Sequence, residues 1–165
     1  MIRFAVIFLV VLIGLLGIEL LRPVQQLVII PFTSGVAAVS AWLLHLFDPQ
    51  VVSQGVILSD LQSGFSVAIR AGCNGVEASI VLIAAILAFP AGWRLKLAGI
   101  GIGLLAIQVL NLARIISLFY LGQWNATAFE WAHLYVWQAL IILDVLILFL
   151  VWLRFLPSRA HEAAA

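Results

Sequence analysis

The sequence is 165 residues long, with 65% hydrophobic and only 9% charged residues. A soluble domain of this length cannot bury so large an apolar share, because the usual share is roughly half. The composition therefore predicts an integral membrane protein that folds as one bundle. The net charge of +1, without any long run of Lys or Arg, argues against a nucleic-acid partner. The single cysteine excludes an intrachain disulfide, and no Cys or His cluster has the spacing of metal ligands.

Four apolar runs predict transmembrane helices over residues 4–21, 73–89, 97–121 and 134–153. Three of them approach or exceed the ~20 residues that cross about 30 Å of hydrocarbon. The run that begins at Val76 is shorter, and residues 73–75 extend it at its polar end. The first run lacks a small-residue cleavage pattern, so we expect an uncleaved anchor. The predicted fold is an all-α polytopic membrane protein, with one domain over residues 1–156 and a cytoplasmic tail over 157–165.

The apolar stretch over residues 24–47 is long enough to cross the membrane, but it contains Pro31 and several polar residues. Basic residues help to place it, because cytoplasmic loops carry an excess of Lys and Arg. With four spans, all the basic clusters fall on one side: Arg3, Arg94 with Lys96, and Arg154 with Arg159. A fifth span would move the N-terminus to the opposite side. We therefore expect residues 24–47 to form an interfacial helix on the outer surface, interrupted near Pro31, with a fifth span as the alternative.

Strand character is confined to residues 48–70. The segments "VVSQGVIL" and "GFSVAIR" are rich in β-branched residues, alternate in part, and are separated by the polar "SDLQS". This pattern predicts a small outer β-hairpin that leads into Cys73. In the four-span topology both termini are cytoplasmic, and residues 22–72 and 122–133 lie outside.

Three polar residues are predicted to lie at one depth near the outer surface. At 1.5 Å per residue, Cys73 lies roughly 24 Å above the cytoplasmic turn, Arg114 roughly 26 Å and His133 roughly 30 Å. Helix ends align in any bundle, so the agreement is most informative for Arg114, which stands inside its apolar run. An arginine there costs a few kcal/mol on insertion scales and needs a partner or a role. The alternatives are a cysteine that only packs, an interfacial histidine, and an arginine that reaches the outer interface.

Two further polar residues lie about one helical turn below these. Glu77 follows Cys73 by four residues on the same helix face, and Asn111 precedes Arg114 by three. Because the two heights match, we expect Glu77 to hold Arg114 through a charge-assisted hydrogen bond.

A Cys–His–Arg set can carry out acyl transfer. The thiolate of Cys73 attacks a carbonyl, His133 moves the proton, and Arg114 supplies hydrogen-bond donors to the oxyanion. The helix N-terminus and Arg114 both favour the anion, so we expect Cys73 to be more acidic than a free cysteine.

The same polar residues allow a second interpretation. Arg70 and Glu130 flank the outer mouth, and Asp144 lies deeper, where its position indicates no firm role. A polar path through Glu77, Arg114 and Asp144 would suit a small transporter or a scaffold subunit without catalytic activity. Composition alone does not separate these functions.

Three sequence blocks resemble the signature blocks of the exosortase/archaeosortase family: "AGCNGVEA", "NLARIISLFY" and "EWAHLYVW". The short chain, "LAFPAGWRLK" and "NLARIISLFYLG" are most similar to the exosortase H branch. The similarity extends over about residues 23–152 and is densest over 65–138. It places the nucleophile of the family on Cys73, its arginine on Arg114 and its histidine on His133.

The resemblance implies a multi-pass membrane cysteine peptidase or transpeptidase that works through a thioester. Its expected substrates are membrane-anchored proteins with a C-terminal sorting signal, which consists of a short motif, a transmembrane helix and a basic end. The resemblance also implies a bacterial inner membrane, an active site that faces the periplasm, and neither a metal nor an organic cofactor. The acyl acceptor, water or an amine, stays open.

Overall fold

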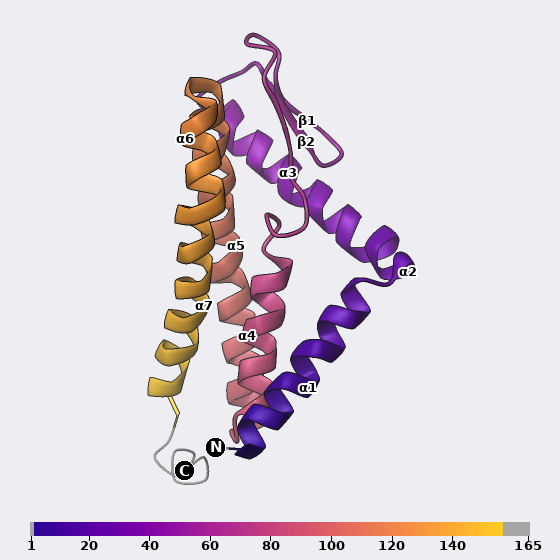
Figure 1. Ribbon diagram of the computed structural model, residues 1–165, viewed down its shortest axis with the longest axis vertical. Coiled ribbons are helices and arrows are strands. Elements are labelled where there is room, and N and C mark those ends of the chain that lie inside the picture. Colours follow the sequence, from indigo (N-terminus) through magenta and orange to yellow (C-terminus); the bar gives the residue numbers. More distant parts are fainter. Residues whose placement is uncertain (1, 157–165) are drawn as a thin grey trace.

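The computed structural model describes residues 2–156 and is mainly helical (Figure 1). The helical elements in chain order are α1 (Ile2–Glu19), α2 (Arg22–Val24), the π-helical η1 (Gln25–Ile29), α3 (Ile30–His45), α4 (Val76–Ala88), α5 (Trp93–Trp124), α6 (Ala126–Trp131), the π-helical η2 (Ala132–Val136) and α7 (Trp137–Arg154). Three strands lie between α3 and α4: β1 (Val51–Gln54), β2 (Ile57–Asp60) and β3 (Ser66–Ala68). The predicted tail over 157–165 lies outside the described residues.

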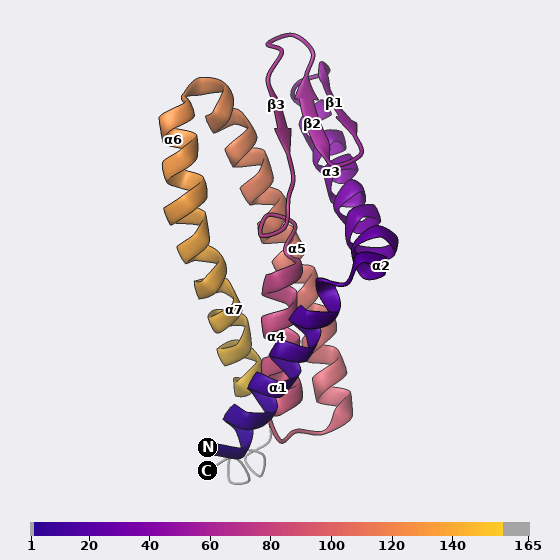
Figure 2. The same cartoon turned by 45° about the vertical axis from the view of Figure 1, so that its right-hand side comes forward.

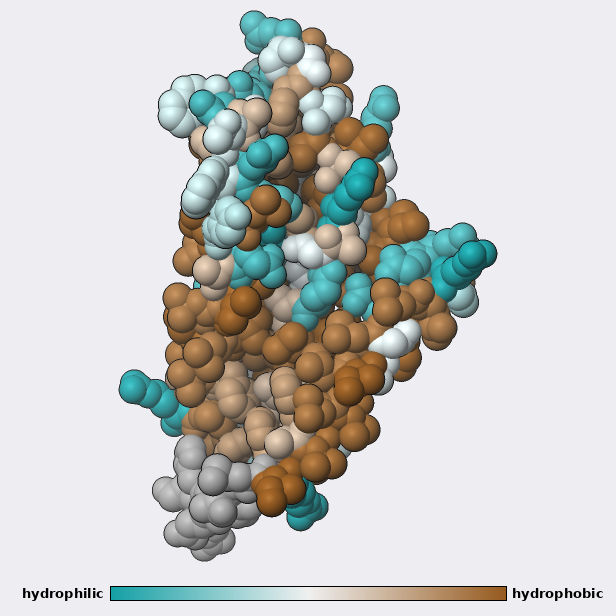
Figure 3. Space-filling view, viewed as in Figure 1, coloured by the Kyte–Doolittle hydropathy of each residue, from teal (hydrophilic) through white to brown (hydrophobic). Residues whose placement is uncertain are grey.

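The lower half of the molecule packs around the short helix α4, which lies against α1, α5 and α7 (Figures 1 and 2). Leu82, Ile86 and Trp152 belong to one buried cluster at this level. Small residues allow helices in a bilayer to approach closely, and Gly103 of α5 lies directly against Leu82. The surface of this half is almost entirely apolar in Figure 3, whereas polar side chains gather above it and around the corner between α1 and α2.

Four helical stretches are long and apolar enough to cross a membrane: Ile2–Glu19, Arg22–His45, Trp93–Trp124 and Ala126–Arg154. The predicted count of four is thereby confirmed for residues 2–156, and the chain is a multi-pass membrane protein. The set differs from the predicted one, because Arg22–His45 qualifies and α4, with 13 residues, is too short by itself. However, α4 shares the apolar lower half with three neighbours, while α3 packs against β1 and the upper part of α5. The outer-surface placement of residues 24–47 stays a prediction.

The interruption that was predicted near Pro31 is a local change of helix type and not a break in the helix. Helical backbone continues from Arg22 to His45, and the π-helical turn η1 ends two residues before Pro31. Proline has no N–H to donate to the residue four positions earlier, and a wider turn accommodates the missing hydrogen bond. The segment therefore forms one helical rod rather than two pieces.

The predicted two-stranded hairpin is instead a three-stranded antiparallel sheet with the order β1-β2-β3. The run "VVSQGVIL", predicted as one strand, folds back on itself at Gly55, whose φ is 58°. Glycine adopts this conformation without a steric penalty and is favoured at the first position of a two-residue hairpin loop. The second turn is held by Asp60, whose carboxylate accepts hydrogen bonds from Gln62 and Ser63. These hydrogen bonds hold the pKa of Asp60 below its usual range.

The sheet is fixed to the helices by a second buried cluster. Leu44 of α3, Val51 and Leu58 of the sheet, and Ile115 and Phe119 of α5 pack together in it. This contact sets the position of β3, and of the loop that follows it, relative to α5.

Candidate active site

Residues 69–75 form the loop that carries the thiol from β3 to the start of α4. Ile69 anchors its upper end, because its side chain is buried and its N–H donates to the carbonyl of Val56 at 2.8 Å. The Cys73 N–H donates to the carbonyl of Arg70 at 2.9 Å, which closes a turn. Gly75 has a φ of 77°, and a Cβ there would lie 2.8 Å from Nε2 of Gln108. A side chain at this position would therefore strain the backbone and require the amide of Gln108 to move.

Asn74 ties the loop to two helices. Its side chain is fully buried and donates from Nδ2 to Oγ1 of Thr33 on α3 at 3.0 Å. Its Oδ1 accepts the N–H of Val76 at 3.1 Å, where α4 begins. Sequence analysis did not assign Asn74 a role, although an Asn directly before an apolar helical run is a known signal for a helix start.

The structure brings together the three residues that were predicted to share one depth. Sγ of Cys73 lies 3.8 Å from Nδ1 of His133 and 3.6 Å from Nη2 of Arg114. The three side chains come from the loop before α4, from η2 and from α5. The thiol thus lies between an imidazole that can exchange a proton with it and a guanidinium that can donate hydrogen bonds. Their catalytic roles stay predictions.

Arg114 is held in place by the loop rather than by an acidic side chain. Its exposed fraction is only 1%, and Nη1 donates to the carbonyl of Gly72 at 2.9 Å. The Gly72 N–H donates to Oε1 of Glu77 at 2.6 Å. The expected direct bond between Glu77 and Arg114 is therefore wrong, and no ion pair joins these two described residues. Both side chains instead bind Gly72, one at its N–H and one at its carbonyl, and so hold the residue next to Cys73 from two sides.

His133 is half-buried and lies in the π-helical turn η2. Its ring stacks on Phe129 of α6, with ring centroids 5.7 Å apart and planes 8° apart. π-helical turns inside helices are frequent at functional sites, since the extra residue changes where the following side chains point. The stacking restricts the plane of the imidazole, and the side chain of His133 lines a groove described below.

Opposing influences act on the charge of the thiol. Burial of the Cys73 side chain and the carboxylate of Glu77 disfavour the thiolate, whereas the guanidinium of Arg114 favours it. The expected acidity of Cys73 stays a prediction.

A groove of about 240 Å³ opens beside these residues. One wall is formed by the end of β3 and the following loop, and the other by α5, α6 and η2. Cys73 and His133 both line it, together with the apolar Ile115 and Leu118. The groove thus brings both the thiol and the imidazole to one open surface.

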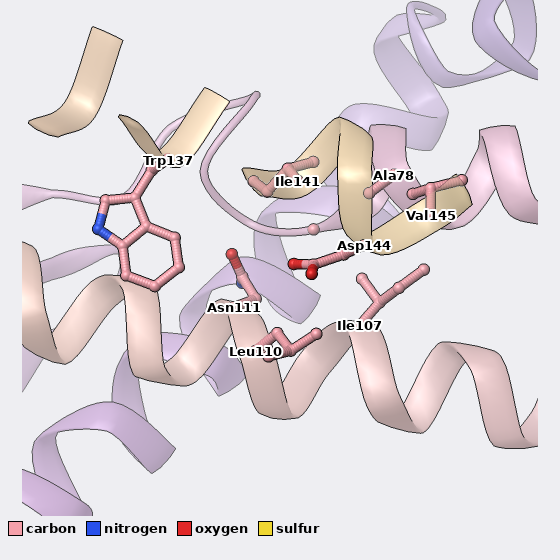
Figure 4. A pocket seen from close by; sticks show the side chains of 9 residues that line it. Ala78, Ile107, Leu110, Asn111, Trp137, Ile141, Asp144 and Val145 are labelled. Atoms are coloured by element: carbon pink, nitrogen blue, oxygen red, sulfur yellow. The ribbon is translucent and has the colours of Figure 1, made fainter. Parts of the chain in front are cut away.

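The remaining predicted residues lie around this centre. Arg70 lines the groove with an exposed side chain, whereas Glu130 is exposed on α6 and makes no side-chain hydrogen bond or ion pair with the described residues. Asn111 is buried below Arg114, and neither atom of its amide has a hydrogen-bond partner among the protein groups described. In Figure 4 its amide and the carboxylate of Asp144 point toward each other across a small pocket between α5 and α7. Asp144 thus lines this pocket and not the groove that contains Cys73 and His133.

Metal ligation has no evident place in this arrangement. Within residues 2–156, no three His, Cys, Asp or Glu side chains are grouped so that they could hold a metal ion. The chemistry that the site offers is that of a thiol, an imidazole and a guanidinium.

The family model of transmembrane exosortases matches residues 1–154, which is nearly the whole chain. Searches of curated proteins and of solved structures gave no match.

Proposed function

Because the chain belongs to the transmembrane exosortase family, we propose that it is a cysteine peptidase or transpeptidase of the bacterial inner membrane, with its site open to the periplasm. Its substrates would be membrane-anchored proteins that carry a C-terminal motif, a transmembrane helix and a basic tail. The observation that carries the proposal is the contact of Sγ of Cys73 with both Nδ1 of His133 and Nη2 of Arg114.

The geometry suits acyl transfer in two steps. His133 takes the proton of Cys73, and Sγ attacks the scissile carbonyl carbon, which becomes a tetrahedral oxyanion. Arg114 stabilises the oxyanion with its guanidinium N–H groups. The intermediate collapses to a thioester on Cys73 as the C–N bond breaks, and the leaving amine receives the proton from His133. Water or an amine then attacks the thioester, and this second step returns the thiol.

The thiol needs a base within reach to become a nucleophile, and the imidazole of His133, whose Nδ1 lies 3.8 Å from Sγ of Cys73, is such a base. The transporter alternative has less support, because Glu77 and Arg114 both bind the backbone of Gly72 instead of lining a continuous polar path.

The test compares the C-terminal peptides of membrane and secreted proteins in cells that express the wild type or Cys73→Ala, identified by mass spectrometry. We expect a set of proteins that lose their C-terminal helix with the wild type and keep it with Cys73→Ala. Asp144→Asn serves as a matched control, since it changes a polar residue of the bundle outside the site, and its pattern should stay close to that of the wild type. An identical set of processed proteins with Cys73→Ala would contradict the proposal.

A further inference from the structure

β3 has a free edge that faces the groove. The sheet order β1-β2-β3 leaves β3 paired on one side only. The carbonyl of Phe65 accepts the N–H of Asp60 in β2, and the N–H of Ile69 donates to the carbonyl of Val56, directly before β2. Because the hydrogen-bonding direction alternates along an antiparallel strand, the N–H and C=O groups of Ser66 and Ala68 point to the opposite side. Both residues are exposed.

This edge leads directly to the nucleophile. Ala68 lines the groove that contains Cys73 and His133, five residues ahead of the thiol. In Figure 2, β3 stands between the other two strands and the pair formed by α5 and α6, and it runs toward the start of α4. An unpaired edge is a template for an additional strand, and peptide-binding domains use such edges to bind extended ligands through main-chain hydrogen bonds.

We propose that the substrate segment just ahead of its transmembrane helix binds the free edge of β3 as a fourth strand, parallel to β3. The proposal rests on the proposed function and adds the way in which the substrate is bound. The parallel direction follows from topology, because a chain that enters from outside and continues into its own membrane helix runs toward the bilayer, as β3 does. Its scissile carbonyl then arrives at Sγ of Cys73 at the lower end of the groove.

Strand addition has two consequences for recognition. Hydrogen bonds from Ser66 and Ala68 hold the backbone of the substrate and do not depend on its sequence. Substrate side chains alternate between the two faces of the extended sheet, so every second one meets the apolar groove wall at Ile115 and Leu118. The site would therefore accept varied sequences that keep an apolar or small residue at alternate positions.

The first test removes one hydrogen-bond donor from the edge. Ala68→Pro deletes an N–H that points away from β2, and proline is tolerated at such positions of edge strands. We expect substrate processing to fall about tenfold, as for the loss of a buried hydrogen bond. Thermal unfolding and the rate of Cys73 alkylation by a small reagent should not change. Ser53→Pro is the matched control, because Ser53 of β1 lies opposite Leu58 of β2 and its N–H points to the far edge of the sheet.

The second test leaves the protein unchanged. A synthetic peptide that covers the cleavage region and helix of a protein identified by the C-terminal comparison is prepared with one N-methyl group at successive positions. We expect slow cleavage at every second position ahead of the cut and near-normal cleavage between them. A wild-type protein that cuts the unmodified peptide, yet tolerates N-methyl groups at all positions, would overturn the strand proposal alone. Failure to cut the unmodified peptide would overturn the proposed function and the strand proposal together.

Discussion

At the residue scale, Arg114 both holds the loop of the site in place and contacts the nucleophile. One nitrogen of its guanidinium binds the carbonyl of Gly72 while the other reaches Sγ of Cys73, at 2.9 and 3.6 Å. A planar fork can make both contacts at once, whereas the ammonium of lysine is a single point of charge on a flexible stem. We predict that the Arg114→Lys variant processes substrate roughly hundredfold more slowly than the wild type. This is the size of effect expected for the loss of one hydrogen-bond donor to the oxyanion.

The control for this prediction is Arg70→Lys. Arg70 lines the same groove, but its side chain is exposed, so it keeps its charge and solvent contact as lysine. Processing by Arg70→Lys should stay near the wild-type rate. Near-normal processing by Arg114→Lys would mean that positive charge alone is required, and the oxyanion role of Arg114 would be wrong.

The two charges beside Cys73 give a second residue-scale prediction, which concerns the pH midpoint of its alkylation. Arg114→Gln removes a charge that favours the thiolate, so the midpoint should move up. Glu77→Gln removes a charge that opposes the anion, so the midpoint should move down. The measurement is the alkylation rate of each variant against pH, and opposite signs would contradict the electrostatic account.

At the scale of elements, a close contact between α5 and α7 holds the lower ends of these two helices together. Trp152 of α7 is buried and donates from Nε1 to the carbonyl of Leu95 at 3.0 Å. Gly99 leaves room for this indole, because a Cβ at residue 99 would overlap its Nε1 and Cδ1. We predict that Gly99→Ala destabilises the fold by about 1–3 kcal/mol, as overpacking usually does.

A nearby glycine provides the comparison for that variant. Gly101→Ala places its methyl group in open space, with nothing within 4 Å, and should be neutral or slightly stabilising. Unfolding of both variants in detergent, followed by the loss of helical signal, gives the difference directly. Equal stabilities would show that α7 can move away from α5 without cost.

The same scale shows why part of the site could be predicted from the sequence. Cys73, Arg114 and His133 were brought to one level by the fixed rise of a helix and the apolar runs that precede or follow them. The carbonyl of Gly72, which binds Arg114, could not be predicted because backbone groups carry no sequence signal. The side-chain hydrogen bond between Asn74 and Thr33 joins residues 41 positions apart. It could not be predicted without the position of α3 relative to the loop.

The boundaries of the strands are a second feature that the sequence pattern did not predict. Alternation and β-branched residues located the strand region, but they did not reveal that Gly55 divides one apparent strand into two. A lone glycine inside a strand pattern indicates either a bulge or a turn, and the choice depends on whether both halves can pack on a helix. Here they can, since Val51 and Leu58 both enter the cluster with α3.

At the scale of the whole molecule, three membrane topologies are compatible with the helices. In the predicted one, α1, α4, α5 and α7 cross and the helix Arg22–His45 lies outside. In the second, Arg22–His45 crosses as well, which gives five spans and an external N-terminus. In the third, Arg22–His45 crosses and α4 does not, so that residues 48–92 are cytoplasmic. Only the first two place Cys73 on the outer side.

Reporter fusions at three positions separate these arrangements. The first topology predicts a cytoplasmic N-terminus, an external reporter after Asp60 and a cytoplasmic reporter after Lys96. The second changes only the N-terminus, and the third makes all three cytoplasmic. We expect the first result, because it alone combines a cytoplasmic Arg3 with an α4 that lies among α1, α5 and α7 in the apolar half of the molecule. A cytoplasmic reporter after Asp60 would place Cys73 on the wrong side for a substrate that arrives from outside, and the proposed function would fail with it.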